Sequence, residues 1–302
     1  MVSRRDFYYE TPEDVDLKVV QFSTKDGTNI GGMLFVPKGK KTEKAVIVLP
    51  GIASEFYGSV PGFLGPGLAH KGISVLSLNT RNHGTQYSYS SFDDCLEDIE
   101  AALDGMSQRY GYNSFSLAGH SLGCTEAVYY AATKNDPRVK SLVLLGAHYD
   151  LKGSTEAFFR AVNPADPASE YKNYLKRCEE LVASGKGKTL LIRPHSLPHP
   201  SLGLEQEYIA ESAQTFVSYR KPESNCSIEK WIKDVKIPMF LPSHEIVTTL
   251  ASPEFSYQIQ KAAVNSPKCD VQIIKKTGHS YQGGENETVE AIATWLRENV
   301  QK

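Results

Sequence analysis

Short, mostly continuous runs of apolar residues recur along the chain and predict strands that are buried on both faces. These runs lie at 45–49, 73–78, 115–118, 141–145, 239–241 and 271–274. A strand that is covered on both faces has no polar side, so its sequence does not alternate. Two earlier apolar stretches, 15–22 and 30–36, bracket the turn Asp26-Gly27. They predict an antiparallel hairpin at one edge of the sheet.

Helical periodicity alternates with these strands. The clearest case is 93–109, where apolar residues recur every three or four positions and form one face. Further helices are predicted at 61–71, 122–134, 253–264 and 286–300, with a turn at 65–67. Alternation of buried strands with helices predicts an α/β fold: a doubly wound, mostly parallel sheet of eight strands with helices on both faces.

One interval interrupts this alternation. Residues 146–238 separate two predicted strands, a connection far longer than the few residues usual in α/β units. Helices are predicted within it at 169–183 and 204–216, with an apolar piece at 189–192 and a loop rich in proline and histidine at 193–200. We interpret residues 150–235 as a cap inserted between strands six and seven, and residues 1–149 with 236–302 as the core domain. The alternative is an excursion that only covers an edge of the sheet.

Composition and charge favour a small-molecule partner over nucleic acid or a membrane. The 302 residues include 33 Lys and Arg against 35 Asp and Glu, a formal net charge of −2, with no long block of one sign. No apolar stretch follows the basic pair Arg4-Arg5, so we expect neither a signal peptide nor a transmembrane helix. Five scattered cysteines favour free thiols in a reducing compartment. We therefore expect a cytoplasmic protein.

The pentapeptide from Gly119 to Gly123, Gly-His-Ser-Leu-Gly, lies between an apolar run and a helical stretch. This is the context of a nucleophile elbow, where a serine is held on a sharp strand-to-helix turn. A serine hydroxyl is a weak nucleophile until a base and backbone N–H donors surround it, and the glycines leave room for neighbouring backbone. Ser121 is therefore the candidate nucleophile. The alternative is an ordinary turn with a capping serine.

The elbow, the hairpin turn, the loop Arg81-Asn82-His83-Gly84 and the segment Gly278-His279-Ser280 together resemble the α/β-hydrolase superfamily over residues 15–300. The resemblance implies the α/β-hydrolase fold with a cap, and a serine hydrolase of the esterase or thioesterase type. It implies that His83 supports the site through structure. Such enzymes take their general base from the loop after the last strand, which is where His279 lies.

The acid that orients the histidine is harder to assign. Relatives carry it after the seventh strand, but this chain reads Ser243-His244-Glu245-Ile246-Val247 where they have a His-Gly pair and then an aspartate. Aligned without a gap, the acid position falls on Val247. A loop that is two residues shorter places it on Glu245, which we predict to be the acid. Asp150, after the sixth strand, is the alternative, because some relatives place the acid there.

Two backbone N–H groups must stabilise the tetrahedral intermediate, and the resemblance places them at Ile52 and Leu122. His195 and His199 are spaced like metal ligands, but the surrounding prolines forbid an aligning helix, so we interpret them as part of a surface loop. The sequence has no glycine-rich phosphate loop and no His/Cys/Asp cluster with metal spacing. We therefore expect no cofactor and no metal.

These residues predict hydrolysis of an ester, thioester or related acyl bond of a small organic substrate through an acyl-Ser121 intermediate. Aromatic residues of the cap offer an apolar or aromatic acyl pocket: Phe158, Phe159, Tyr171, Tyr174, Tyr208, Phe216 and Tyr219. Two alternatives stay open. The same triad serves enzymes that cleave carbon–carbon bonds or modify polyketide-like substrates. The missing standard acid and the sequence Pro50-Gly51 in place of His-Gly favour a non-catalytic binding protein on a hydrolase fold.

Overall fold

The structure, a computed structural model, describes residues 11–40, 42–149, 151–195, 197, 205, 207–247 and 252–300. Its main sheet contains β1 (Val15–Ser23), β2 (Asn29–Pro37), β3 (Lys44–Leu49), β4 (Ser74–Leu78), β5 (Ser114–His120), β6 (Val139–Leu145), β9 (Met239–His244) and β10 (Cys269–Ile274). The strand order is β1-β2-β4-β3-β5-β6-β9-β10. Only the pairs β1–β2 and β2–β4 are antiparallel. The predicted eight-stranded, mostly parallel sheet with a hairpin at one edge is therefore confirmed.

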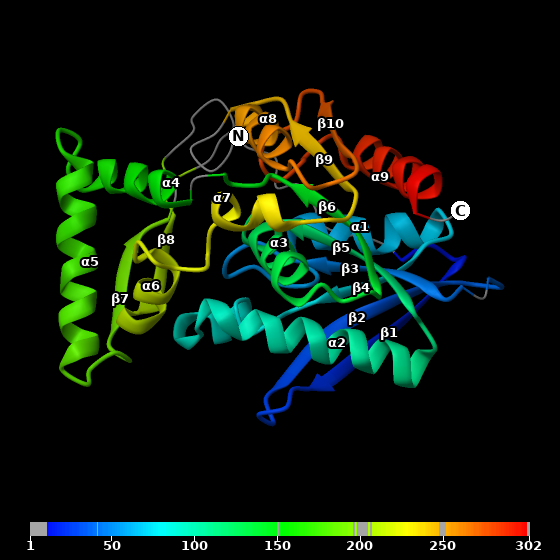
Figure 1. Cartoon of the computed structure of the whole chain (residues 1–302), viewed down its shortest axis with the longest axis horizontal. Coiled ribbons are helices and arrows are strands. Elements are labelled where there is room, and N and C mark those ends of the chain that lie inside the picture. Colours follow the sequence, from blue (N-terminus) through cyan, green and yellow to red (C-terminus); the bar gives the residue numbers. More distant parts are fainter. Residues whose placement is uncertain are drawn as a thin grey trace.

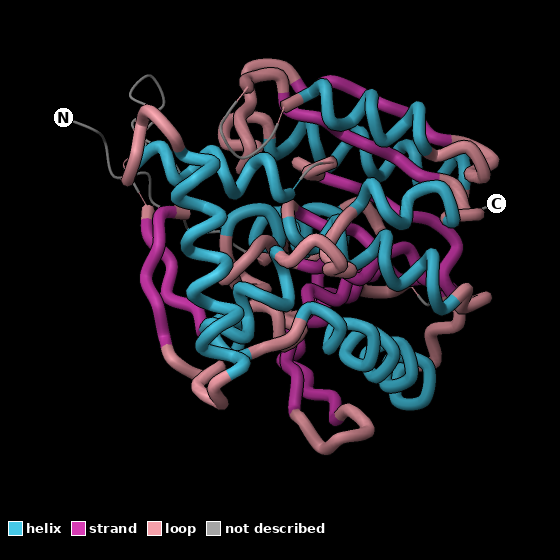
Figure 2. Tube along the Cα trace, turned by 60° about the vertical axis from the view of Figure 1, so that its left-hand side comes forward, coloured by secondary structure: helices cyan, strands magenta, loops and turns pink. Residues whose placement is uncertain are grey.

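Helices in the described chain cover both faces of this sheet (Figure 1 and Figure 2). They are α1 (Ser59–His70), α2 (Cys95–Tyr110), α3 (Leu122–Lys134), α8 (Pro253–Ala262) and α9 (Glu285–Asn299). Apolar side chains of α2, α3 and α8 form one core with the sheet, and those of α1 and α9 form the core on the opposite face. None of these helices, nor any other in the described residues, is long and apolar enough to cross a membrane.

The turn predicted at 65–67 is wrong, because these residues lie inside α1. Their glycines allow close packing of the helix. A Cβ atom on Gly65 would lie 2.5 Å from the ring of Phe35, and one on Gly67 would lie 2.7 Å from Val289 of α9. Neither glycine is needed here for a special backbone angle.

Between β6 and β9 the chain forms a separate group of elements at one end of the main sheet (Figure 1). They are α4 (Leu151–Phe158), α5 (Pro167–Ala183), β7 (Leu190–Pro194), β8 (Tyr208–Ser212) and α6 (Ala213–Arg220), and the next helix, α7 (Ile228–Trp231), returns to the main sheet. Among the described residues, strands β7 and β8 form a separate antiparallel pair. From α7 onward the chain packs in the main core, since Ile228 and Ile232 join the cluster that contains α2 and α3.

The helix predicted at 204–216 is wrong over most of its length. Residue 204 lies outside the described residues, and the chain from Tyr208 to Ser212 is strand β8. Burial alternates from Tyr208 to Glu211, with Ile209 and Glu211 buried and Tyr208 and Ala210 exposed, and Ser212 at the end of the strand is buried as well. Glu211 forms a fully buried ion pair with Arg193 of β7. That partner lies 18 positions away, so local periodicity could not reveal it.

Candidate active site

Ser121 lies at the turn between β5 and α3, with φ +53° and ψ −114°. This conformation is unfavourable for a residue with a side chain, and proteins retain such strain mainly at functional sites. The two motif glycines are sterically required. A Cβ atom on Gly119 would lie 2.3 Å from the backbone of Gly123, and one on Gly123 would lie 2.4 Å from the carbonyl oxygen of Leu49. The turn therefore has the tight backbone that a nucleophile elbow needs.

Two backbone N–H groups beside Ser121 are available for a ligand. In the described chain, the turn, loop and cap hydrogen bonds include none donated by the N–H of Ile52 or of Leu122. The N–H of Gly123 donates to the carbonyl of Pro50 over 3.0 Å, which ties the elbow to the loop after β3. Gly51 permits close approach of that loop, because a Cβ atom there would lie 3.3 Å from the Cβ of Ser121.

A network of buried polar side chains fixes the loop after β3. His83 Nε2 lies 3.1 Å from Glu126 Oε2, and both side chains are fully buried. Thr80 donates its hydroxyl to the other carboxylate oxygen of Glu126 over 3.1 Å. His83 Nδ1 lies 2.9 Å from the carbonyl oxygen of Gly51. A carbonyl oxygen only accepts hydrogen bonds, so Nδ1 carries a proton and fixes the residue that precedes Ile52.

His279, on the loop between β10 and α9, lies among three other histidine rings. The ring centres of His120, His148 and His244 are 4.8, 5.6 and 5.9 Å from that of His279. Burial lowers the pKa of His279 well below its ordinary value, and neighbouring histidines lower it further. Burial also lowers the pKa of His120 to about 4 and that of His148 to about 3. His279 is therefore neutral at pH 7 and can accept a proton.

This histidine cluster does not have the arrangement of a metal site. Within the described ranges, no group of three or more His, Cys, Asp or Glu residues could hold a metal ion. Its members instead make separate contacts with protein atoms. His120 Nε2 lies 3.0 Å from the carbonyl oxygen of His279, and His244 Nδ1 lies 2.8 Å from that of Ile246.

Ser121 and His279 line the same cavity, which has a volume of about 440 Å³. The loop after β3 forms one wall through Ile52 and its neighbours. His195, Tyr208 and Ile209, from the interval between β6 and β9, form another. The cavity lies at the carboxyl ends of the parallel strands, where ligands bind in open α/β sheets, and its size suits a small molecule.

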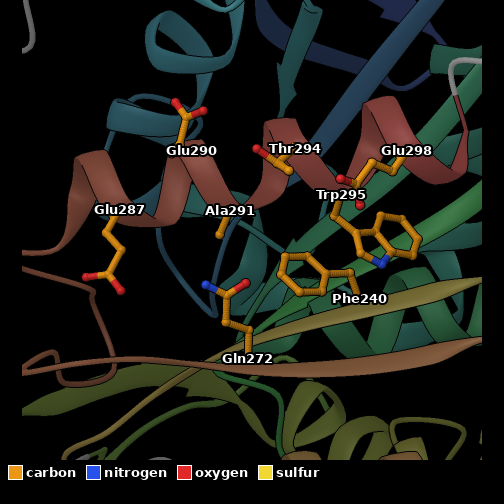
Figure 3. Close-up of a pocket in the computed structure, with 8 residues that line it drawn as sticks. All are labelled: Phe240, Gln272, Glu287, Glu290, Ala291, Thr294, Trp295 and Glu298. Carbon is orange, nitrogen blue, oxygen red and sulfur yellow. The ribbon is translucent and has the colours of Figure 1, made fainter.

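Figure 3 shows a second hollow, between α9 and the strands β9 and β10. It has a volume of about 330 Å³ and is lined by Phe240, Gln272, Glu287, Glu290, Ala291, Thr294, Trp295 and Glu298. None of the predicted site residues is among them. Glu290 is turned toward Lys71, with which it forms an ion pair at 2.6 Å.

Glu245 lies on the protein surface rather than against His279. Its Oε2 accepts a hydrogen bond from the backbone N–H of Lys276 over 2.8 Å, and its side chain is exposed. The structure forms no hydrogen bond between Glu245 and His279, whose Nδ1 is buried without a partner in the described chain. Asp150, the alternative acid, lies outside the described residues.

Sequence reasoning missed most of the histidine cluster. His120 and His244 are the last residues of β5 and β9, and His148 follows β6. Carboxyl ends of parallel strands meet at one edge of a sheet, so histidines at the ends of several predicted strands indicate that these side chains lie close together. The sequence predicts a surface loop at His195, but the structure places this residue in the cavity wall. Its N–H donates to the carbonyl of Glu207 over 2.9 Å, so the pairing of β7 with β8 extends to it.

The aromatic residues between β6 and β9 that were expected to line an acyl pocket mostly pack against one another instead. Phe159, Tyr171 and Phe216 form a buried cluster between α5 and α6, with Tyr174 packed against it. Tyr219 packs with Tyr87 and Phe92 in a neighbouring cluster. Tyr208 differs, since it lines the cavity of Ser121 and is largely exposed.

Comparison with known proteins agrees with this architecture. Among solved structures, a hypothetical protein of Pseudomonas aeruginosa has a TM-score of 0.72 at 18% identity, covering 97% of this chain and 96% of its own. An α/β hydrolase of Penicillium sp. sh18 has a TM-score of 0.69 at 17% identity, covering 95% and 100%. An esterase of Pyrococcus furiosus has a TM-score of 0.65 at 16% identity, covering 94% and 91%. At such identities these structures show a shared fold.

No curated protein matches the sequence. The model of the α/β-hydrolase fold family matches residues 44–221, more than half of the chain. This segment contains β3, the elbow with Ser121, and the chain as far as α6. The protein therefore belongs to the α/β-hydrolase family.

Proposed function

We propose that this protein is a serine hydrolase that cleaves an ester, thioester or related acyl bond of a small organic substrate. The observation that carries the proposal is the shared cavity of Ser121 and His279. One residue has the strained backbone of a nucleophile elbow, and the other is a buried imidazole that is neutral at pH 7. The N–H groups of Ile52 and Leu122 beside them donate no turn, loop or cap hydrogen bond in the described chain.

In the proposed reaction, Ser121 Oγ attacks the acyl carbon while His279 Nε2 takes the hydroxyl proton. The N–H groups of Ile52 and Leu122 hold the negative charge that develops on the acyl oxygen. The bond to the leaving group then breaks, and His279 returns its proton to the departing alcohol or thiol. A water molecule attacks acyl-Ser121 with the same proton transfer through His279, which releases the acid and restores the serine.

The chain between β6 and β9 is proposed to act as a cap that selects the acyl group. His195, Tyr208 and Ile209 stand in the cavity wall, so their side chains are placed to contact a substrate bound near Ser121. The wall combines apolar side chains with the polar His195 and Glu207. We therefore favour an acyl group that carries both apolar and hydrogen-bonding parts.

A substrate panel with matched variants tests this proposal. Purified wild type, Ser121→Ala and His279→Ala are assayed with short and long acyl esters, acyl thioesters and vinylogous diketones. Turnover of esters or thioesters that both variants lack supports acyl hydrolysis. Activity on diketones alone would indicate carbon–carbon bond cleavage instead. A Ser121→Ala variant as active as wild type, or a wild type that turns over no substrate and resists labelling by a fluorophosphonate, would contradict the proposal.

A further inference from the structure

His279 has a buried ring nitrogen, Nδ1, that lacks a hydrogen-bond partner in the described chain. This inference rests on the proposed function, in which Nε2 takes the proton of Ser121. Nδ1 then carries a hydrogen and needs an acceptor that fixes the ring. In the described part of the chain, Nδ1 is buried and has no hydrogen-bond partner. A Cβ atom on Gly146 would lie 2.8 Å from Nδ1, so this edge of the ring faces the end of β6.

His244 presents the complementary acceptor. It ends β9, the strand hydrogen-bonded beside β6. Its Nδ1 lies 2.8 Å from the carbonyl oxygen of Ile246, so Nδ1 carries the hydrogen of the neutral ring and Nε2 is bare. Burial lowers the pKa of His244, which keeps the ring neutral at pH 7. Like Nδ1 of His279, Nε2 of His244 is buried without a partner in the described chain.

The other two histidines of the cluster fit this task less well. The bare nitrogen of His120 is Nδ1, because its Nε2 donates to the carbonyl of His279. That Nδ1 is directed toward Gly51, where a Cβ atom would lie 3.3 Å from it, and β5 separates the Gly51 loop from β6. His148 Nδ1 lies 3.3 Å from the hydroxyl of Ser154, which can donate or accept, so its bare nitrogen is not fixed.

We propose that His244, rather than the exposed Glu245, orients His279, giving the order Ser121, His279, His244. The two rings stand nearly perpendicular, at 84°, with centres 5.9 Å apart. Hydrogen bonds that serve catalysis are often long before substrate binds and shorten in the complex. Closing the donor of His279 onto the acceptor of His244 satisfies two buried polar atoms at once. His244 is a positioning residue, because it acts through His279.

The surrounding loop contacts hold both rings in place. Ile246 accepts from His244 through its carbonyl, and its N–H donates to the carbonyl of Thr277 over 2.9 Å. The carboxylate of Glu245 accepts the N–H of Lys276, a residue in the left-handed conformation with φ +59°. The loop that carries His279 is therefore tied to the end of β9. In this arrangement Glu245 joins the two loops without contact to the imidazole.

Kinetics of His244→Phe and His244→Asp test the proposal, and Glu245→Gln and Asp150→Asn test the two carboxylates that compete with His244 for the role. His244→Phe keeps a ring but removes the acceptor, and should lower kcat by about 10- to 100-fold with little change in KM. His244→Asp supplies an acceptor and should recover most of that loss. Its negative charge also favours the imidazolium, so the acid limb of the kcat/KM profile should move up by about one pH unit or more. If His244 holds the role, neither carboxylate variant should show a comparable loss of kcat.

Proton NMR of the same variants supplies a readout that does not depend on turnover. With a boronic acid bound in the cavity to mimic the tetrahedral intermediate, we expect a low-field imidazole N–H signal in wild type that is absent from both His279→Ala and His244→Phe, while circular dichroism confirms that each variant is folded. Wild-type turnover in His244→Phe, a His244→Asp variant as inactive as His244→Phe, or a large loss in Asp150→Asn or Glu245→Gln would overturn the role of His244. Full activity in Ser121→Ala would instead defeat the serine hydrolase itself.

Discussion

His83 and Glu126 form a fully buried pair, with Nε2 and Oε2 3.1 Å apart, directly behind the loop that carries Ile52. The pair links α3, which begins at the elbow, to the loop after β3. Neither partner reaches the cavity of Ser121, yet both hold the backbone that we propose binds the oxyanion. A change at this pair should therefore affect both the stability of the protein and its turnover, and the two effects can be measured separately.

Replacing His83 by alanine should impair both stability and turnover. The substitution removes the contact of Glu126 Oε2 and leaves the buried carboxylate with only the hydroxyl of Thr80 among the described residues, which should lower the free energy of unfolding by about 3–5 kcal/mol. Release of the Gly51 carbonyl should lower kcat by about 10-fold at a temperature where the variant is folded, since the oxyanion donor is no longer held. Urea unfolding and ester kinetics measure the two effects. The control is His70→Ala, which removes an exposed contact with Asp14 and should change neither. An unchanged kcat in His83→Ala would show that the pair of His83 and Glu126 does not position the proposed oxyanion donor.

Gly146→Ala should reduce activity through the position of His279. The added Cβ atom would lie 2.8 Å from Nδ1 and 2.9 Å from Cε1 of that ring. Misplacement of a catalytic group by about 1 Å can cost about 100-fold in rate, so we expect a loss of that order. Gly111→Ala is the matched control, because Gly111 also has a positive φ, +78°, but open space around it. Both variants bear similar backbone strain. Equal kcat in the two variants would refute a specific effect on His279.

The site histidines should make stability fall as the pH drops. Unfolded histidine binds a proton below about pH 6.5, whereas the folded pKa is about 4 for His120 and about 3 for His148. Below pH 6.5 the unfolded state therefore holds more protons, and stability is lost progressively toward these lower values. Urea midpoints between pH 7 and pH 5 should decrease, and His148→Gln should flatten the trend. A midpoint that rises on acidification would contradict the neutral, buried cluster.

The lowered pKa of His279 has a matching consequence for catalysis. The free enzyme should keep its base unprotonated at pH values where an exposed histidine is already charged. The acid limb of kcat/KM should therefore lie below about pH 6.5 in the wild type.

Tyr208→Ala should change which acyl groups are accepted while leaving the chemistry at Ser121 intact. Tyr208 lines the cavity from the proposed cap and is largely exposed, so its removal should enlarge the cavity without a large loss of stability. The ratio of kcat/KM for long and short acyl esters should shift, whereas the rate of labelling by a small fluorophosphonate should stay close to wild type. Tyr57→Ala, another exposed tyrosine that does not line this cavity, serves as the control. An unchanged ester profile would argue against selection by this part of the cap.

The sequence predicts the sheet well because each buried strand is marked by a run of adjacent apolar residues. Continuous apolar runs predict β3, β4, β5, β6, β9 and β10, and the glycines of the elbow fix a turn whose dihedrals and contacts depend on adjacent residues. The interval between β6 and β9 is predicted less well. Strand β8 depends on pairing with β7 and on a buried ion pair to Arg193, which no short-range pattern contains.

The residues of the candidate site also differ in how well the sequence predicts them. Ser121 and His279 follow from motif and position, and the structure places them on one cavity. The orienting residue depends on how three loops converge, and shifting a loop alignment by one residue exchanges Glu245 for His244. Only the contacts distinguish the two, because one side chain reaches the surface and the other is buried beside His279.

Direct detection of an acyl group on Ser121 tests the central claim most closely. Wild type, His279→Ala and Ser121→Ala are mixed with an activated aryl ester, quenched in acid and digested, and the peptides are analysed by mass spectrometry. The proposed mechanism predicts an acyl adduct on the peptide that contains Ser121 in wild type during turnover, and its absence from His279→Ala and from Ser121→Ala. Steady ester turnover with no adduct on that peptide, or an adduct and turnover that persist in Ser121→Ala, would contradict it.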